Sequence, residues 1–440
     1  MSIYNQLLAK ETAISVIGLG YVGLPLAVEF SQYVNTIGFD VNPAKIAAYQ
    51  SKTDPTGELD NAQMAASHVE YTTDPTRLKD ALFHIIAVPT PITIDNLPDL
   101  SFVAGACEVL GPHLAKGAIV VCESTVYPGA TEEICIPILE KLSGLKCGVD
   151  FKLGYSPERI NPGDKEHTLT NIVKVVSGMD KECLAEISNI YAIAIKAGVY
   201  PVSSIKTAEA VKVVENTQRN INIGFMNEVA MLFDAMDIDT FEVLGAMNTK
   251  WNALGFTPGL VGGHCISVDP HYLMSGARRI NQQCRIIKES HRLNDVMASF
   301  VAKKIIKQLV LANKASNDAK IALLGITFKA NTADTRNSKV VEVMRHLEAY
   351  GINLSVVDPV ADKQAVKAEY DIDLVELAHL NDLDCIIVAV PHNEFASLGL
   401  RGLEVFFNAD EPYKNKAIVD IQGMLNKNEV EEKGYRYWRL

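Results

Sequence analysis

The stretch AISVIGLGYVGLPLAVEF, residues 13 to 30, decides the fold of the first part of the chain. A short β-branched run stops on glycine, and apolar residues at helical spacing follow it, which predicts a strand, a tight turn and a helix. The next apolar run, residues 36 to 39, ends on Asp40. A GxGxxG turn between a strand and a helix, with an acidic residue after the second strand, is typical of a dinucleotide site. The turn residues expected to contact the cofactor are Gly18, Gly20, Tyr21, Val22 and Gly23.

The chemistry of this turn favours NAD. Its glycines let a pyrophosphate approach backbone amides at a helix N-terminus, where the helix dipole favours negative charge. Asp40 would accept hydrogen bonds from the adenosine ribose and repel a 2′-phosphate, which favours NAD over NADP. Lys45 could also reach the ribose or phosphate. The alternative is a glycine turn in some other α/β domain. It does not explain why the strand, the helix, the three glycines and the acidic residue occur together.

Further strands are expected at residues 84 to 88, 118 to 123 and 152 to 155. In a doubly wound sheet the carboxyl ends of the strands form the ligand crevice. We therefore expect Thr90, Thr125 and the turn 156 to 159, SPER, to face the cofactor and its substrate. For each threonine a helix N-cap is an alternative role.

Two long helices are predicted in the middle of the chain, over residues 207 to about 236 and 286 to about 311, because neither stretch contains proline or a strand-like run. The first helix carries Lys212 and Asn216 at i and i+4, on one face. Helices of this length are a plausible spine and dimer surface. The alternative role for Lys212 is a solvated surface charge.

The last part of the chain repeats the first. KIALLG (320 to 325), LSVVDP (354 to 359) and IVAVP (387 to 391) echo the earlier strand segments and predict a second Rossmann-like domain. Its first turn lacks the three glycines, so it should hold the nucleotide part of a substrate rather than a second dinucleotide, with Lys329 or Arg336 supplying charge. The expected fold is α/β, with two Rossmann-like doubly wound domains (1 to 200 and 313 to 440) joined by a helical central domain (201 to 312) with a long spine helix.

Composition limits the function classes. The 48% hydrophobic and 21% charged content is that of a globular protein, and no apolar run approaches the length of a membrane span. The net charge of −12 disfavours broad binding to nucleic acid or anionic membrane. The N-terminal residues have no export signal pattern, so we expect a cytoplasmic protein. Eight cysteines without regular spacing argue against a disulfide framework or a zinc finger.

The stretch GLVGGHCISVDP, residues 259 to 270, places Cys265 behind two glycines and four residues before Asp269. Paired glycines permit close approach of a ligand, and a thiol there can be a nucleophile. A small apolar cysteine in a turn is the common alternative.

Six motifs occur in one order along the chain: GLGYVGLP, ESTVYPG, SPERINPGD, AEAVKVVENTQRNINIGFMNE, GLVGGHCISVDP and GITFKANTADTR. With them the chain resembles the UDP-sugar and GDP-sugar 6-dehydrogenases from end to end. The resemblance implies oxidation of a sugar C6 alcohol to a carboxylate with two NAD per turnover, in a homodimer that takes a UDP-sugar. It also implies a thiohemiacetal and then a thioester on Cys265. The residues implied as catalytic are Cys265, Lys212, Asn216, Asp269, Thr125 and Glu158.

In the implied mechanism Lys212 and Asn216 stabilise charge on the C6 oxygen, and Lys212 favours the thiolate. Water held by Asp269 and Thr125 serves as the base. Implied cofactor contacts add Asp40, Lys45, Thr90, Thr125 and Arg336 to the glycine turn. Implied substrate contacts are Glu158, Arg159, Asn161, Lys212, Asn216, Trp251, Asn252, Gly262 and Lys329, with the glycines at 262 and 263 leaving room for the sugar C6.

The SPERINPG segment departs from glucose-oxidising members, which tend to carry a second glutamate there. This departure and the segment at Trp251 and Asn252 resemble members that act on UDP-N-acetylhexosamines, UDP-GlcNAc or UDP-GalNAc. Such uronic acids commonly feed capsule or O-antigen polysaccharide. UDP-ManNAc or UDP-glucose oxidation is the alternative within the family.

Two alternatives lie outside the family. One is a zinc hydrolase that uses His264, Cys265, Asp269 and His271, although adjacent ligands rarely reach one metal and no metal site is expected. The other is a non-catalytic nucleotide-binding protein in which Cys265 is inert.

Overall fold

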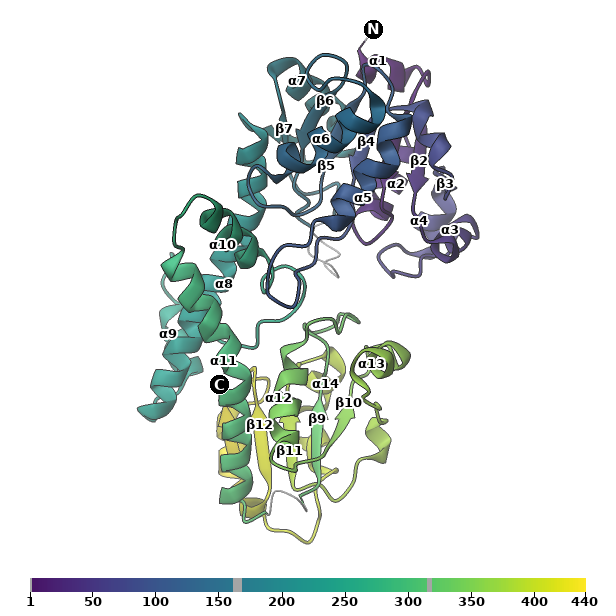
Figure 1. Ribbon diagram of the computed structural model, residues 1–440. Helices are drawn as coiled ribbons and strands as arrows, with labels where there is room; N and C mark the ends of the chain where they lie inside the picture. The colour runs from purple at the N-terminus through teal and green to yellow at the C-terminus, as the bar shows by residue number, and fades with distance from the viewer. Residues whose placement is uncertain (1, 161–167, 315–318) are drawn as a thin grey trace. The chain divides into compact units, whose positions relative to one another are not determined.

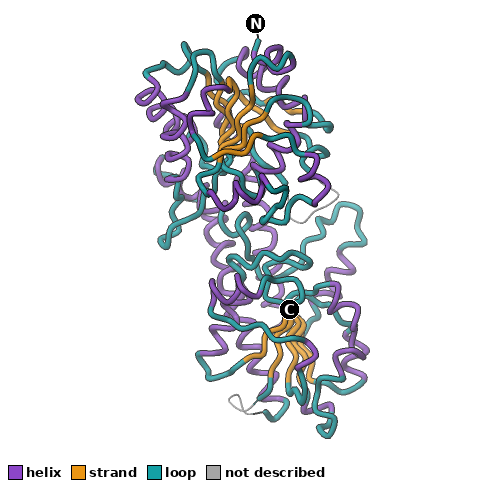
Figure 2. The backbone as a smooth tube through the Cα atoms, turned by 90° about the vertical axis from the view of Figure 1, so that its right-hand side faces the viewer, coloured by secondary structure: helices purple, strands orange, loops and turns teal. Residues whose placement is uncertain are grey.

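The computed structural model of the chain describes residues 2–160, 168–314 and 319–440. It divides into two compact units, the first made of Met1–Glu215 with His271–Gln283 and the second of Asn216–Pro270 with Cys284–Leu440. Each unit contains one mainly parallel sheet covered by helices (Figures 1 and 2), which confirms the α/β class with two Rossmann-like domains. The division into three domains stays a prediction. None of the described helices is long and apolar enough to cross a membrane.

The first unit is built on an eight-stranded sheet in the order β3-β2-β1-β4-β5-β6-β7-β8. All neighbours run parallel except β6 and β7, which are antiparallel. The order reverses between β1 and β4, which is the topological switch point where such sheets bind ligands. The strands are β1 (Ala13–Ile17), β2 (Thr36–Phe39), β3 (Glu70–Thr72), β4 (Ala81–Ile86), β5 (Ile119–Cys122), β6 (Lys152–Tyr155), β7 (Lys174–Gly178) and β8 (Val199–Pro201).

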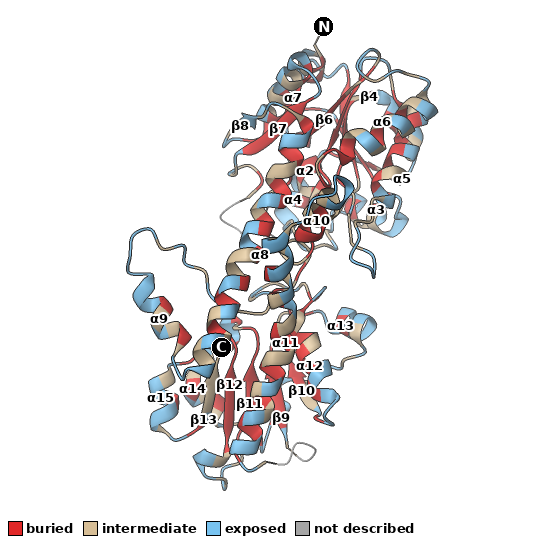
Figure 3. Cartoon of the chain, turned by 60° about the vertical axis from the view of Figure 1, so that its left-hand side comes forward, coloured by how far each residue is buried: buried red, intermediate tan, exposed pale blue. Residues whose placement is uncertain are grey.

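Strands β1 and β5 are buried at every residue, and the neighbouring strand β4 at all but one. Figure 3 shows strands of this sheet mostly in the colour of buried residues. A strand covered on both faces is apolar at nearly every position, as β5 is. The one polar residue of β1, Ser15, is hydrogen-bonded to His84 at 2.7 Å. The helices of the unit are α1 (Ile3–Leu8), α2 (Gly23–Ser31), α3 (Pro43–Gln50), α4 (Asn61–Ala66), α5 (Ser101–Leu110), α6 (Ala130–Ser143) and α7 (Lys181–Ala194), with 3-10 turns η1 (Pro75–Asp80) and η2 (Gly111–His113).

The second unit holds a five-stranded parallel sheet in the order β10-β9-β11-β12-β13. Its strands are β9 (Ile321–Leu324), β10 (Leu354–Val357), β11 (Cys385–Val388), β12 (Ala417–Asp420) and β13 (Arg436–Arg439). Its shorter helices are α9 (Thr240–Met247), α12 (Lys339–Glu348), α13 (Lys363–Tyr370), α14 (Asn393–Glu404) and α15 (Lys427–Glu432), with 3-10 turns η3 (Leu377–His379) and η4 (Tyr413–Asn415).

Both predicted long helices are present, as α8 (Ile205–Ala235) and α11 (Arg285–Leu311). Helix α11 packs on α12 and on β12 and β13, and its buried face joins the core of the second sheet. Helix α8 and helix α10 (Asp269–Arg279) each contribute residues to both units.

Several strand predictions require correction. The strand expected at 84 to 88 is β4, which begins at Ala81 and ends at Ile86, and the one expected at 387 to 391 is β11, which ends at Val388. In both cases the apolar run continues past the last ladder residue into the loop, so hydrophobicity alone misplaces the end. The strands β7 and β8 were not predicted, because β7 opens with a lysine and β8 is only three residues long.

Candidate functional site

The glycine turn after β1 has the shape that a dinucleotide requires. Gly18 has a φ of +95°, and a Cβ there would lie 2.7 Å from the Ala87 carbonyl oxygen. A Cβ on Gly23 would lie 1.9 Å from the Gly18 carbonyl oxygen, so this glycine lets α2 pack against the turn. A Cβ on Gly20 would meet no heavy atom within 4 Å. Position 20 is therefore the open one, as the close approach of a pyrophosphate demands, and the residues fit a dinucleotide.

Asp40 lies directly after β2 and is tied to this turn. Its Oδ2 accepts the Leu19 backbone N–H at 3.0 Å, and its Oδ1 accepts the Asn42 N–H at 2.9 Å. The ammonium of Lys45 lies 3.9 Å from Oδ2. Backbone donors thus fix the orientation of the carboxylate beside the glycine turn. The ribose contacts of Asp40 and Lys45 stay a prediction.

Polar residues follow β4 and β5, as predicted. The hydroxyl of Ser124 donates to the Val88 carbonyl at 2.7 Å and accepts the Val88 N–H at 3.0 Å, which joins the ends of the two strands. The Thr90 carbonyl accepts a hydrogen bond from the Tyr272 hydroxyl at 2.8 Å. Thr90 and Thr125 therefore lie in loops at the carboxyl edge of the first sheet, where β4 borders the switch point.

The SPER turn after β6 is held by its own charged side chains. The carboxylate of Glu158 accepts the backbone N–H groups of Arg159 and Ile160 at 2.6 and 2.7 Å. The guanidinium of Arg159 forms a two-bond ion pair with Glu215 of α8, at 3.1 Å from Nε and 2.6 Å from Nη2. This ion pair fastens the turn to α8, and the expected contact of Arg159 with the sugar stays a prediction. Asn161, also expected there, lies outside the described residues.

Lys212 is buried, with 8% of its surface exposed, which rules out the alternative of a solvated surface charge. Asn216 follows one helical turn later on α8 and is 3% exposed. Its amide nitrogen donates to Asp269 Oδ2 at 2.5 Å, and its carbonyl oxygen accepts from Arg219. The structure thus brings together two residues predicted to share the site, although they are 53 positions apart in sequence.

Cys265 lies in the loop that leads into α10 and is partly exposed. Its carbonyl oxygen accepts the N–H groups of Val268 and Asp269 at 3.1 and 2.9 Å, which closes a turn between the thiol residue and the carboxylate. Asp269 is 2% exposed. Through this turn and the Asn216 bond, Cys265, Asp269 and Asn216 form one connected group within the second unit.

The glycines before Cys265 let another part of the chain approach the cysteine loop closely, and the room expected there for the sugar stays a prediction. A Cβ on Gly262 would lie 2.7 Å from the Asn337 carbonyl oxygen, and one on Gly263 would lie 2.9 Å from the ring of Phe328. Gly263 also has a φ of +80°. The close approach that these glycines permit is to the protein's own chain, the segment that follows β9.

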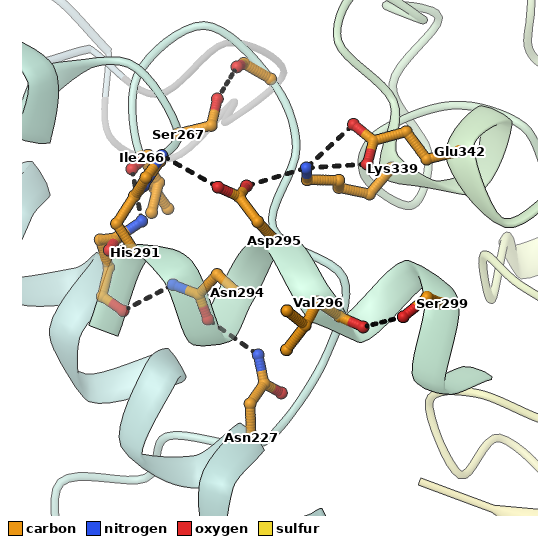
Figure 4. A network of polar contacts seen from close by, with 12 residues as sticks. Asn227, Ile266, Ser267, His291, Asn294, Asp295, Val296, Ser299, Lys339 and Glu342 are labelled. Carbon is orange, nitrogen blue, oxygen red and sulfur yellow. Dashed lines mark hydrogen bonds and ion pairs between the residues drawn. The ribbon is translucent and has the colours of Figure 1, made fainter. Parts of the chain in front are cut away.

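Three asparagines hold the cysteine loop to α8 and α11, and Figure 4 shows two of them, Asn227 and Asn294. Asn227 exchanges two hydrogen bonds with the backbone of Gly259, at 2.8 and 3.0 Å, and donates to Asn294 Oδ1 at 2.8 Å. Asn294 donates in turn to the Asn220 carbonyl at 2.9 Å. Asn220 donates to the Ile266 carbonyl, next to Cys265, at 3.0 Å. Both ends of the loop are therefore pinned by buried amides.

The first turn of the second sheet differs from the glycine turn, as predicted. Asp358 follows β10 as Asp40 follows β2, but it accepts from the N–H groups of Ile326 and Thr327 and lies 3.1 Å from Nε2 of buried His392. Burial raises the pKa of Asp358, yet the His392 bond and the backbone donors outweigh it and lower the pKa to about 2. This carboxylate serves the fold of the turn.

The other residues assigned to substrate or cofactor lie in loops and turns of the second unit. Arg336 forms a two-bond ion pair with Asp334 at 2.7 and 2.9 Å. Lys329 lies in the segment after β9 and is exposed. Trp251 is 92% exposed and Asn252 is exposed, both past the end of α9. Their contacts to NAD or sugar stay predictions.

The zinc alternative gains no support. Within the described ranges, no group of three or more His, Cys, Asp and Glu side chains could hold a metal ion. The eight cysteines, all described, form no disulfide.

Sequence reasoning missed several polar residues behind the site. Glu123, Lys174 and Tyr191 surround Glu158 or its partners, and Glu209 of α8 caps α6 by accepting the N–H groups of Gly129 and Thr131. The asparagines 220, 227 and 294 also escaped notice. Glu123 belongs to the ESTVYPG motif, so the sequence offered a signal for it. Nothing in the sequence indicated its partners, which lie 51 or more residues away.

Comparison with known proteins identifies the family of the chain. Three sequence models of the UDP-glucose/GDP-mannose dehydrogenase family match the chain: the NAD binding domain at residues 12–195, the central domain at 206–296 and the UDP binding domain at 322–427. The chain belongs to this family. It is an NAD-dependent nucleotide-sugar 6-dehydrogenase, an oxidoreductase that takes a UDP-sugar as substrate.

Named relatives of this dehydrogenase cover nearly its whole length. Protein CapL of Staphylococcus aureus is 47% identical over 97% of this chain and 99% of its own. The UDP-N-acetyl-D-glucosamine 6-dehydrogenase of Pseudomonas aeruginosa is 45% identical over 93% of this chain and 98% of its own. Among solved structures, the UDP-D-ManNAc dehydrogenase of Pyrococcus horikoshii has a TM-score of 0.87 at 29% identity, and the match covers 97% of this chain and 98% of that one.

Proposed function

We propose that this dehydrogenase oxidises the C6 hydroxyl of a UDP-N-acetylhexosamine, UDP-GlcNAc or UDP-GalNAc, to the uronic acid. The observation that carries the proposal is the 45% identity to the P. aeruginosa UDP-N-acetyl-D-glucosamine 6-dehydrogenase over almost the full length of both chains. The P. horikoshii UDP-D-ManNAc dehydrogenase shares the fold at only 29% identity. The SPER turn supports the same choice, because it lacks the second glutamate of glucose-oxidising members.

The proposed chemistry runs through Cys265. When bound, NAD removes one pair of electrons and one hydrogen from C6 in each of two oxidations. After the first, the Cys265 thiolate adds to the C6 aldehyde and gives a thiohemiacetal. After the second, the carbon is a thioester, and water releases the carboxylate and the thiol. One alcohol, two NAD⁺ and one water thus become one carboxylate, two NADH and three protons.

The roles proposed for the other residues follow from their contacts. Asn216 uses one amide hydrogen on Asp269, so its second amide hydrogen can serve the C6 oxygen. Lys212 lies one helical turn away, buried and cationic, and would stabilise negative charge on the same oxygen. Asp269, held by Asn216, would accept the released proton through water. Thr125 and Glu158 are proposed to support the water and the sugar.

The test of the substrate is a comparison of NADH formation with UDP-GlcNAc, UDP-GalNAc, UDP-ManNAc and UDP-glucose, each with NAD. The proposal expects kcat/KM for one of the first two to exceed that for UDP-glucose by about tenfold or more, because a site built for an acetamido group loses its partners with a hydroxyl. Equal or better turnover of UDP-glucose would overturn it. Preference for UDP-ManNAc would favour the function named for the P. horikoshii enzyme.

We propose a role in capsule or O-antigen polysaccharide precursor synthesis, supported by the likeness to Protein CapL.

We also propose a homodimer that uses α8. Phe225 and Leu232 are spaced seven residues apart on one face of this helix, with Met236 just past its end, and they are 57%, 55% and 56% exposed. Exposed apolar side chains on one stripe are typical of an interface.

A further inference from the structure

A lysine and two glutamates form a buried cluster beneath the SPER turn. Lys174 opens β7, Glu123 follows β5 directly, and Glu158 lies in the turn after β6. The Lys174 ammonium lies 2.8 Å from Glu123 Oε2 and 2.8 Å from Glu158 Oε2. The three residues are 4%, 3% and 8% exposed. One cation therefore bridges two carboxylates in the interior.

The remaining oxygens of both carboxylates have donors as well. The hydroxyl of Tyr191, on α7, donates to Glu123 Oε1. Backbone N–H groups of Arg159 and Ile160 donate to Glu158 Oε1. The Lys174 ammonium also lies 5.6 Å from the centre of the Tyr191 ring. Donors of this kind are what allow these charges to be buried.

The two carboxylates differ in their tendency to ionise. Burial raises the pKa of Glu123, and the charge of Glu158 raises it further against the opposing effect of Lys174. Burial also works to raise the pKa of Glu158, but the charge of Lys174 and its hydrogen bond, with the two backbone donors, lower it overall. Glu158 is therefore the carboxylate that Lys174 holds ionised, while Glu123 takes up a proton more readily.

Lys174 also lies next to a second set of contacts that hold the same turn, those of Arg159. The Arg159 guanidinium, besides its ion pair with Glu215, donates to the carbonyl of Val173, the residue before Lys174, at 3.1 Å. The turn is thus held on one side by Lys174 of β7 and on the other by Glu215, which stands on α8 between Lys212 and Asn216 in sequence. The groups that face Glu158 across these contacts are Glu123, Lys174, Tyr191, Arg159 and Glu215.

We propose that Lys174 is a positioning residue of the oxidation site, which fixes Glu158 as an oriented carboxylate facing the sugar-binding turn. Glu158 then serves the substrate as a constant hydrogen-bond acceptor and not as a group that gives up protons. This rests on the proposed function, because Glu158 is itself only proposed to support the sugar.

The test compares Glu123→Gln with the double variant Glu123→Gln/Lys174→Met. Because the glutamine at position 123 carries no charge, the loss of Lys174 leaves one buried carboxylate without its cation instead of two. We expect the acid limb of the kcat/KM profile to move upward by about one pH unit or more in the double variant, because burial then acts on Glu158 unopposed. At pH 6 we expect a loss of about tenfold in kcat/KM relative to Glu123→Gln. Folding is checked by circular dichroism and NAD binding.

The matched control is Lys152→Met. Lys152 also pairs with two carboxylates, Asp180 and Glu182, but at the opposite end of β6 and in a half-buried position. This variant should keep the wild-type profile. If the double variant folds and its acid limb and kcat/KM equal those of Glu123→Gln, the proposal is wrong.

Two further measurements keep the outcome decisive. If the double variant does not fold, Glu158→Gln decides: kcat/KM within about twofold of wild type would show that the charge of Glu158 is not used, and would overturn the proposal.

If the wild type oxidises no UDP-sugar, the proposed function has failed. The calorimetric Tm difference between wild type and Glu158→Gln then tests the coupling by itself. Because the pKa of Glu158 is lowered in the folded state, the Tm difference should shrink as the pH falls from the ordinary range of a glutamate toward the folded value. A Tm difference that does not depend on pH would contradict an ionised Glu158.

Discussion

The amide nitrogen of Asn216 donates to the buried carboxylate of Asp269 at 2.5 Å, and the backbone N–H of Asp269 donates to the carbonyl of Cys265 at 2.9 Å. A residue of the long helix α8 is therefore linked through one carboxylate to the loop that carries the thiol. Because each residue was assigned to the site from sequence alone, their joint placement is the strongest geometric support for the proposed chemistry.

Removal of this link should impair catalysis more than binding. Asn216→Ala takes one donor from a carboxylate that is 2% exposed, and we expect kcat to fall by roughly 10²-fold. The dissociation constant of NAD should stay within about twofold of wild type. The control is Asn222→Ala on the same helix. Steady-state kinetics that show equal kcat for both variants would contradict the role of Asn216.

The cofactor preference should depend on Asp40. Asp40→Asn keeps the size of the side chain but removes the charge that repels a 2′-phosphate, so the ratio of kcat/KM for NADP to that for NAD should rise by about tenfold. Asp74→Asn removes an exposed carboxylate that caps a 3-10 turn in the same unit and serves as the control. An unchanged ratio in Asp40→Asn would remove Asp40 from the ribose site.

The C-terminal strand is held by a carboxylate whose effect should be lost in acid. Asp239, which caps α9, is bonded by Arg439 and Lys427. Burial acts to raise the pKa of Asp239, but hydrogen bonds from Arg439 and Lys427 lower it to about 2. A lowered pKa stabilises the folded state above the ordinary carboxyl range and loses this effect as the pH falls through the folded value.

We therefore expect Asp239→Asn to reduce stability by about 1 to 2 kcal/mol at neutral pH, and the difference from wild type to vanish between about pH 4 and pH 2. Calorimetric Tm values of both proteins across this range provide the measurement. A Tm difference that does not depend on pH would show that the ion pairs of Asp239 contribute nothing.

The proposed dimer should respond to charge on the exposed stripe of α8. Leu232 is 55% exposed, so Leu232→Glu leaves the fold of the protomer intact and places a charge in the interface. Light scattering should show a dimer for wild type and a monomer for this variant at micromolar concentration. Exposed Glu228→Gln on the same helix is the control, and a dimer in both variants would exclude this surface.

The sequence predicted the elements whose signals are local. Strand β6 and helices α8 and α11 were placed within two residues, because a pure strand run and long helical periodicity need no tertiary information. The glycine turn and Asp40 were recognised for the same reason. The thiol, Asp269 and the helix pair Lys212 and Asn216 came from motif resemblance.

What the sequence did not predict depends on distant partners. Arg159 looks like a sugar contact in its motif, and only the fold shows that Glu215 of α8 takes its guanidinium. The glycines at 262 and 263 suggested room for a ligand, and only the fold shows that Phe328 and Asn337, more than 60 positions away in the sequence, approach them closely. Lys174 bridges carboxylates that are 51 residues before it and 16 residues before it.

The measurement that tests the central claim most directly is the number of NADH formed per UDP-GlcNAc or UDP-GalNAc consumed, in wild type and in Cys265→Ser. The account predicts about two NADH and a uronic acid for wild type, and at most about one NADH with a rate of acid formation at least about 10³-fold lower for the variant. Carboxylate formation by Cys265→Ser at the wild-type rate, with two NADH per sugar, would contradict covalent catalysis by this cysteine.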